Sequence, residues 1–209
     1  DLRIVHAAWL PESLATLEAA VGENLIAQYR RYDDELVHAL QTASWYGDYL
    51  REQARHAEAL ENADMPPPPM PATAQYELAR SRLHPIRALT SGAEVIAPAP
   101  FYAGGRWRYT ARSAWWQNYH DTSAVLIGHY WRHWYPRDAD PTRENLMPPQ
   151  NNAWHGAAHN VFCIDYSVGA RWRDRKAGIA PARSEFRLAA MRWPERVLVF
   201  DDGEVAATV

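Results

Sequence analysis

The sequence predicts a mixed α/β fold, of the α+β kind, on the strength of three observations. Short apolar runs end abruptly in polar residues, as buried strands do. A longer segment repeats its apolar residues with helical spacing. A Gly-Gly pair separates two runs that are typical of an antiparallel hairpin. The chain of 209 residues is long enough for a single domain, residues 1–209, that contains an insert.

Composition excludes several classes of protein. The net charge of −3 provides no overall attraction for nucleic acid or for an anionic membrane. No apolar run reaches the roughly 20 residues that span a bilayer. The single cysteine, Cys163, rules out an internal disulfide and suits a reducing compartment, so we expect a cytoplasmic protein.

The first expected element is a short strand over residues 2–6, which ends in His6. Pro11 is well placed to open a helix, and Gly22 is placed to close it. Because the chain starts at once with a buried type of strand, we expect it to be a fragment of a longer domain.

The pattern then predicts a helical insert over residues 23–90. Asp33 or Asp34 can cap a helix over residues 33–60. Its weakly apolar stripe repeats at spacings of four and three, and so predicts one continuous helix. The stripe consists of Leu36, Leu40, Ala43, Gly47, Leu50, Ala54 and Ala57.

A proline-rich run over residues 65–71 predicts an extended segment. A stiff connector is the simpler interpretation, and recruitment of a proline-binding domain is the alternative. Residues 72–90 predict another helix, interrupted near Pro85.

The second half of the chain predicts strands. Gly104 and Gly105 indicate a hairpin turn. Apolar runs at residues 124–128 and 160–165 predict buried strands. An antiparallel pair is expected around the turn at residues 194–195, with its strands at residues 186–193 and 196–200.

Two of the expected strands lead directly into a histidine, His6 or His129. Gly128 lets the backbone turn tightly where the second strand stops. Ligands bind at the carboxyl ends of strands in open α/β sheets, and imidazole is a common metal ligand. Neighbouring strands would therefore bring both histidines to one metal. The alternative is two hydrogen-bonded histidines beside a core, since no Cys-x-x-Cys or i, i+4 histidine pair accompanies them.

Four motifs carry a resemblance to a known family. They are LRIVHAAW at 2–9, GHYW at 128–131, CIDYSV at 163–168 and AAMRW at 189–193. In this order they resemble the carboxyl-terminal half of bacterial calcineurin-like metallophosphoesterases. The branch is the one related to serine/threonine protein phosphatases and symmetrical diadenosine-polyphosphate hydrolases. The resemblance covers residues 1–20 and about 90–203, and it implies part of a two-sheet sandwich flanked by helices.

The resemblance also implies roles for individual residues. His6 and His129 would be ligands in a site of two divalent metal ions, with Mn²⁺ the expected metal. Such ions polarise phosphoryl oxygens and lower the pKa of a bridging water. Arg112 would bind the substrate phosphate through its guanidinium, or else is an exposed strand residue. Tyr166 would lie over the phosphate and Asp165 would support a histidine, or else both are structural.

The sequence also departs from the family. It contains none of the motifs Gly-Asp-x-His-Gly, Gly-Asp-x-x-Asp-Arg-Gly and Gly-Asn-His-Glu, which supply most of the metal ligands and the catalytic acid in the family. No catalytic residue is therefore assigned, and the missing half would belong to the same longer chain or to a partner chain.

Two functions follow from these observations. The first is a metal-dependent phosphoesterase that hydrolyses phosphate esters or phosphoanhydrides of a phosphoprotein or nucleotide-type substrate, inactive in this chain alone. The second is a non-catalytic, tryptophan-rich binding or scaffold module derived from the same fold.

Overall fold

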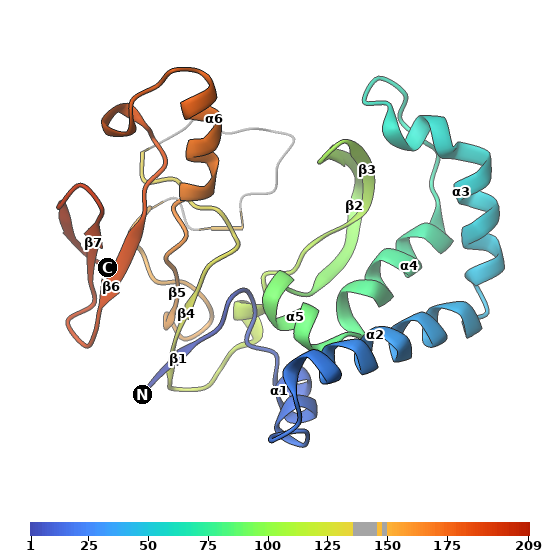
Figure 1. Ribbon diagram of the computed structural model, residues 1–209, viewed down its shortest axis with the longest axis horizontal. Coiled ribbons are helices and arrows are strands. Elements are labelled where there is room, and N and C mark those ends of the chain that lie inside the picture. The colour runs from blue at the N-terminus through green and yellow to red at the C-terminus, as the bar shows by residue number, and fades with distance from the viewer. Residues whose placement is uncertain (136–145, 148–149) are drawn as a thin grey trace. The chain divides into compact units, whose positions relative to one another are not determined.

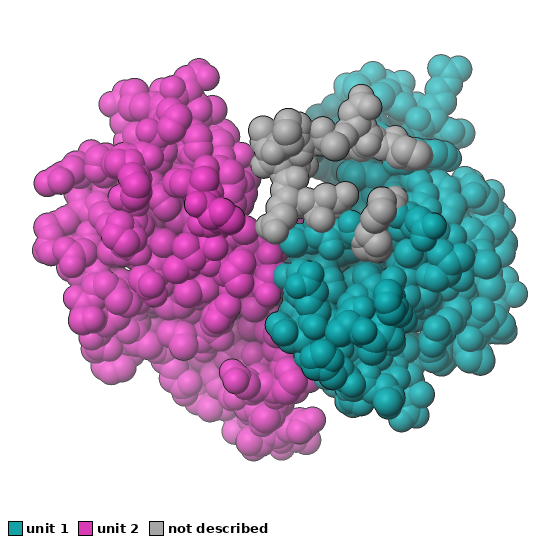
Figure 2. All heavy atoms as spheres, turned by 180° about the vertical axis from the view of Figure 1, so that it is seen from behind, with its two compact units in different colours: residues 1–9, 114–209 teal, residues 10–113 magenta. Residues whose placement is uncertain are grey.

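Helices and three small sheets make up the described part of the chain, and the predicted mixture of α and β structure is confirmed (Figure 1). The structure is a computed structural model that describes residues 1–135, 146–147 and 150–209. Its contacts define a first unit of residues 1–9 and 114–209 and a second unit of residues 10–113, coloured separately in Figure 2. These boundaries lie outside the predicted insert of 23–90, because the first helix and the hairpin pack onto the helices of the insert.

The first unit is built around a parallel sheet. Its strands are β1 (Leu2–Ile4), β4 (Ala124–Ile127) and β5 (Val161–Cys163), in the order β1-β4-β5. Every residue of β4 is buried, as expected for the central strand of such a sheet. Three of the predicted strands therefore lie side by side, with their carboxyl ends at one edge.

An antiparallel sheet completes the core of the first unit. It contains β6 (Ala189–Arg192), β7 (Val197–Phe200) and β8 (Val205–Ala207), and its first two strands confirm the predicted pair. Side chains of both sheets share one buried cluster, listed here: Ala124, Leu126, Trp154, Phe162, Tyr166, Leu198 and Phe200. Burial of each large apolar side chain contributes about 1.5–3 kcal/mol, so this cluster holds the two sheets together.

Short helices connect these strands. They are the 3-10 helices η1 (Trp115–Asn118), η2 (Val168–Ala170) and η3 (Pro181–Arg183), and the α-helix α6 (Arg171–Lys176). Within the described residues, no helix combines the length and the apolar character needed to cross a bilayer.

Five helices form most of the second unit: α1 (Pro11–Glu18), α2 (Leu25–Thr42), α3 (Tyr46–Glu61), α4 (Pro71–Arg82) and α5 (Pro85–Ser91). Three of them begin with a proline, whose missing N–H costs nothing in the first turn. The predicted opening of a helix at Pro11 and the interruption near Pro85 are thus confirmed.

The predicted continuous helix over 33–60 is wrong at both its start and its middle. Asn24 caps α2, because its side chain accepts hydrogen bonds from the amides of Ile26 and Ala27. Ala43 is extended, with ψ of 139°, and ends α2 before α3 begins. Beyond this break the predicted apolar stripe is not buried, since Leu50 is 50% exposed.

Aromatic and polar contacts orient α3 instead. The ring of Tyr49 stacks on that of Tyr76 in α4, with centroids 3.9 Å apart. Gln53 donates a hydrogen bond to the hydroxyl of Thr73 at 2.9 Å. Aromatic and polar residues make these contacts, so they do not appear in the spacing of apolar residues. The spacing of small apolar residues therefore predicted the wrong buried face for α3.

The hairpin of β2 (Glu94–Ala103) and β3 (Arg106–Arg112) turns at Gly104 and Gly105, as predicted. Both glycines have positive φ, which a type I′ turn requires. Tyr109 in β3 is buried in a small cluster with Leu60 and Met70.

The proline-rich connector is anchored to this hairpin. The hydroxyl of Tyr109 donates to the carbonyl of Pro68 at 2.9 Å, and Met70 is buried. These contacts support the interpretation as a connector.

Candidate functional site

The two strand-terminal histidines lie side by side in the first unit. The ring centroids of His6 and His129 are 5.5 Å apart and their planes are inclined by 53°. His6 follows β1 and His129 follows β4, which are adjacent parallel strands. The amide of Gly128 donates to the carbonyl of His6 at 2.9 Å and ties the two strand ends together. The topology therefore brings both predicted metal ligands to one sheet edge.

Asp165 fixes the backbone of His129. It lies just beyond β5, and its Oδ2 accepts a hydrogen bond from the amide of His129 at 3.0 Å. Its Oδ1 accepts another from the amide of Ser167 at 2.9 Å. His129 and Ser167 have φ of 64° and 63°, a region that non-glycine residues rarely occupy. One carboxylate thus stabilises two strained residues at the edge where β4 and β5 end.

The predicted role of Gly128 in the turn is corrected by the structure. Gly128 is absent from the residues with positive φ, whereas His129 and Trp131 adopt φ of 64° and 50°. A Cβ placed on Gly128 would lie 3.5 Å from the carbonyl oxygen of His6, an ordinary contact. The left-handed backbone conformations after β4 are therefore adopted by His129 and Trp131 and not by Gly128.

Tyr166 belongs to the core of the first unit. It is 1% exposed, and its hydroxyl donates to the carbonyl of Asn151 at 2.7 Å. Burial raises the pKa of this phenol. We therefore give Tyr166 a packing role and no contact with a phosphate.

A buried arginine, Arg132, contacts the carboxyl end of β5, and the sequence did not single it out. Arg132 is 3% exposed, and its guanidinium donates to the carbonyls of Cys163 and Gln150 at 3.3 and 2.8 Å. Burial lowers the pKa of Arg132. Its side chain links β5 to the segment near residue 150, and no local pattern in the sequence signals this link.

Arg112, the predicted phosphate ligand, belongs to the second unit. It ends β3, opposite Glu94 in the register of the hairpin. Of the four predicted site residues, the structure therefore brings together His6 and His129 within one unit.

The histidine pair fits part of a metal site. An imidazole nitrogen binds a divalent metal at about 2.1 Å, so two rings that share an ion have centroids at most about 6.5 Å apart. The observed 5.5 Å satisfies this limit. In the described part of the chain, no cluster of three or more His, Cys, Asp and Glu residues could hold an ion. Two imidazoles are thus a partial ligand set.

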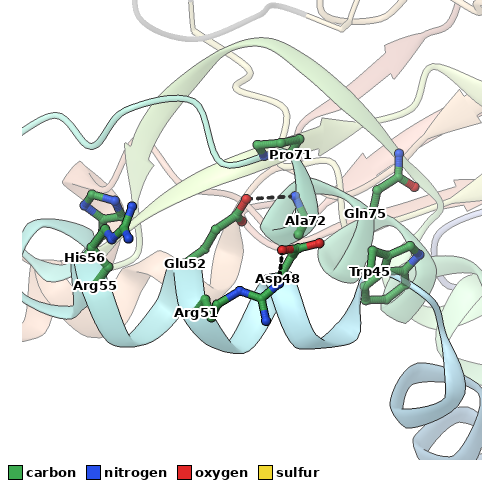
Figure 3. A pocket seen from close by; sticks show the side chains of 9 residues that line it. All are labelled: Trp45, Asp48, Arg51, Glu52, Arg55, His56, Pro71, Ala72 and Gln75. Carbon is green, nitrogen blue, oxygen red and sulfur yellow. Dashed lines mark hydrogen bonds and ion pairs between the residues drawn. The ribbon is translucent and has the colours of Figure 1, made fainter.

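A pocket of about 440 Å³ lies in the second unit, between α3 and the start of α4 (Figure 3). Glu52 stands within it and accepts hydrogen bonds from the amides of Ala72 and Thr73, which start α4. Arg51 pairs with Asp48 on its rim. None of the predicted site residues lines this pocket, and its Glu52 carboxylate is committed to holding two helices together.

Comparison of the chain with models of protein families, with curated proteins and with solved structures found no match in any of the three.

Proposed function

We propose that this chain is part of a metal-dependent phosphoesterase in which His6 and His129 bind a divalent metal ion. The observation that carries the proposal is the 5.5 Å separation of their ring centroids at the carboxyl ends of adjacent parallel strands. The strained backbone of His129, held by Asp165, supports it, because such strain persists where a side chain must be aimed.

The residues of the chain would position the metal ion and the substrate phosphate. A pair of bound divalent ions, Mn²⁺ in this proposal, would polarise the phosphoryl group and lower the pKa of bound water. His6 and His129 would hold one ion, and Asp165 would keep His129 in place. Arg112 is proposed to bind a phosphate of the substrate, a phosphate ester or phosphoanhydride of a phosphoprotein or nucleotide type. The remaining ligands would come from a segment or partner chain that carries the motifs absent here.

The second candidate is the tryptophan-rich binding or scaffold module. It is favoured by the exposure of Trp131 and Trp172, of which 57% and 47% is accessible. Exposed large aromatic side chains are common at sites where proteins bind one another.

Binding of Mn²⁺ to the histidine pair tests the first proposal directly. We expect Mn²⁺ to broaden the ring NMR signals of His6 and His129 before those of His38, which is exposed on α2. His6→Ala and His129→Ala should each weaken Mn²⁺ binding by at least about tenfold, because each removes a ligand. His38→Ala is the matched control. Equal broadening at all histidines would contradict the proposal.

Hydrolysis of para-nitrophenyl phosphate tests the need for the missing motifs. The isolated chain should show negligible Mn²⁺-dependent activity, and co-expression with a segment that carries the three motifs should restore it. In the restored protein, His129→Ala should reduce kcat/KM by at least about 100-fold, and Arg112→Ala should leave the metal content intact while weakening substrate binding. Strong activity of this chain alone would show that the site is misassigned.

A further inference from the structure

Positive charge is concentrated in one segment of the first unit. Residues 171–183 contain five of the 22 arginine and lysine residues and a single acidic residue, in a chain of net charge −3. The segment comprises α6, the loop after it and η3. Clustered like charge on an otherwise acidic protein is typical of an interaction surface.

Most of these cations form no ion pair among the described residues. Arg171 pairs with Asp201 and donates to the carbonyl of Phe186 at 2.7 Å, so its charge is balanced. The other four cations are exposed and form no ion pair within the part of the chain that the structure describes. They are Arg173, Arg175, Lys176 and Arg183. A surface that leaves four cations unpaired has charge available for an anionic partner.

Apolar groups accompany the charges. Trp172 is 47% exposed, with the Nζ of Lys176 at 4.5 Å and the guanidinium carbon of Arg173 at 5.8 Å from its ring centre. Ile179 is 41% exposed and, with Pro181, lines a hollow of about 140 Å³ whose other lining residues are Arg171, Asp174, Arg175 and Ser184. A hollow of this size takes one side chain. The segment thus carries cations, an exposed aromatic ring and a small recess that Arg175 also lines.

We propose that residues 171–183 dock a short acidic peptide segment of a partner protein. Its carboxylates would pair with exposed cations of the segment, Arg175 at the recess among them, and one apolar side chain would enter the recess beside Ile179. This docking is separate from the proposed phosphoesterase activity and uses none of its residues.

Size and charge favour a peptide over nucleic acid. The six residues of α6 span about 9 Å, the length of about three residues of extended peptide. The ring of Trp172 already carries cations at its face, so it is not a bare platform for stacked bases. The nearby carboxylate of Asp201 and the net charge of −3 would repel a long polyanion.

Fluorescence anisotropy with a labelled Glu-Glu-Leu-Glu-Glu peptide tests the proposal. We expect saturable binding that weakens with salt, and no binding of the matched Gln-Gln-Leu-Gln-Gln peptide. The triple variant R173E/R175E/K176E should bind at least about tenfold more weakly, because like charges then oppose the peptide. The triple variant R30E/R55E/R192E has the same net charge from three other exposed arginines and should bind as the unmodified protein does.

Lys176 provides a second, local readout because it is the single lysine in the sequence. Bound peptide should slow acylation of Lys176 several-fold, while the amino terminus of the chain reacts at an unchanged rate. This measurement needs no substitution and so does not depend on the folding of a variant.

Three outcomes would overturn the proposal. The first is absence of binding or of protection at Lys176. The second is an equal loss of affinity in both triple variants. The third is tighter binding of short single-stranded DNA or of phosphatidylserine vesicles than of the acidic peptide, which would assign the surface to nucleic acid or to membrane.

Discussion

Backbone strain separates the two units of this protein. The first unit contains all five described non-glycine residues with positive φ, namely His129, Trp131, His159, Ser167 and Arg196. In the second unit, the described residues with positive φ are all glycines: Gly22, Gly92, Gly104 and Gly105. Glycine adopts this conformation without steric cost, so the second unit makes its turns where no side chain is needed. The first unit keeps side chains at such positions, which is typical of functional sites.

Carboxylates show the same contrast. In the second unit, Glu52 accepts from amides at the start of α4, and Glu77 accepts from the amides of Tyr109 and Thr110 in β3. In the first unit, Asp165 accepts from two amides of strained residues. In both units a side-chain carboxylate accepts hydrogen bonds from two backbone amides. In the second unit these bonds join helices and strands, and in the first unit they hold the backbone at the sheet edge that carries His6 and His129.

The largest expected effect compares two glycines with positive φ. Gly156→Ala in the first unit should destabilise the protein by about 4 kcal/mol, because its Cβ would lie 2.9 Å from the carbonyl oxygen of Trp116. Gly105→Ala in the second unit has nothing within 4 Å of the new Cβ and should cost about 1 kcal/mol. Urea unfolding of both variants measures the difference. Equal losses would show that the backbone near Trp116 moves aside easily.

The next effect compares two carboxylates that hold backbone amides. Asp165→Ala should cost about 3 kcal/mol, because two amides lose their acceptor and two strained residues are released. Glu77→Ala also removes hydrogen bonds but releases no strained residue, so about 2 kcal/mol is expected. NMR of the histidine rings should report a disturbed His6–His129 pair in the first variant. A smaller loss for Asp165→Ala than for Glu77→Ala would contradict the role assigned to strain.

A buried histidine should make the protein sensitive to acid. His155 is 6% exposed, and neither of its ring nitrogens has a hydrogen-bond partner among the described residues. Burial, aided by the charge of Arg132, lowers the pKa of His155 from 6.5 to about 3. Between these two pH values, His155 is protonated in the unfolded chain and neutral in the folded chain. The free energy of unfolding therefore decreases as the pH falls from 6.5 towards 3.

His155→Leu should remove this loss. Its free energy of unfolding should fall between pH 7 and pH 5 by about 2 kcal/mol less than that of the unmodified protein. His38→Leu, at an exposed position on α2, should leave the pH dependence unchanged. Identical pH profiles for all three proteins would refute a neutral buried His155.

The smallest effect concerns Glu94 in the second unit and has the opposite sign. Burial, with the nearby charge of Glu77, raises the pKa of Glu94. The folded chain then binds its proton more tightly, so stability is present at low pH and is lost as the pH rises through the raised pKa. Glu94 and Glu77 both contact the single hydroxyl of Thr110, which can donate to one of them.

Glu94→Gln should therefore stabilise the protein by about 1 kcal/mol at pH 7 and have little effect near pH 4, because its amide can donate to Thr110. Thermal unfolding at the two pH values measures this difference. A destabilised variant at pH 7 would show that attraction by Arg108 and Arg112 outweighs burial.

Local chemistry determined the elements of this protein that the sequence by itself predicts. A proline in the first turn opens α1 and α5, a pair of glycines turns the β2–β3 hairpin, and a four-residue apolar run makes β4 a buried strand. Each of these effects acts over a few residues, so it can be predicted from the sequence without knowledge of the fold. The same local rule placed His129 directly after a strand.

The tertiary structure alone decided where those elements meet. It placed β1 next to β4, far apart in the chain, and so brought His6 to His129. It placed the carboxylate of Asp165 against the backbone amide of His129 and left the predicted apolar stripe of α3 exposed at Leu50. It also buried Tyr166 and Arg132. These outcomes depend on packing and hydrogen bonds between residues distant in sequence, which apolar spacing and turn residues do not encode.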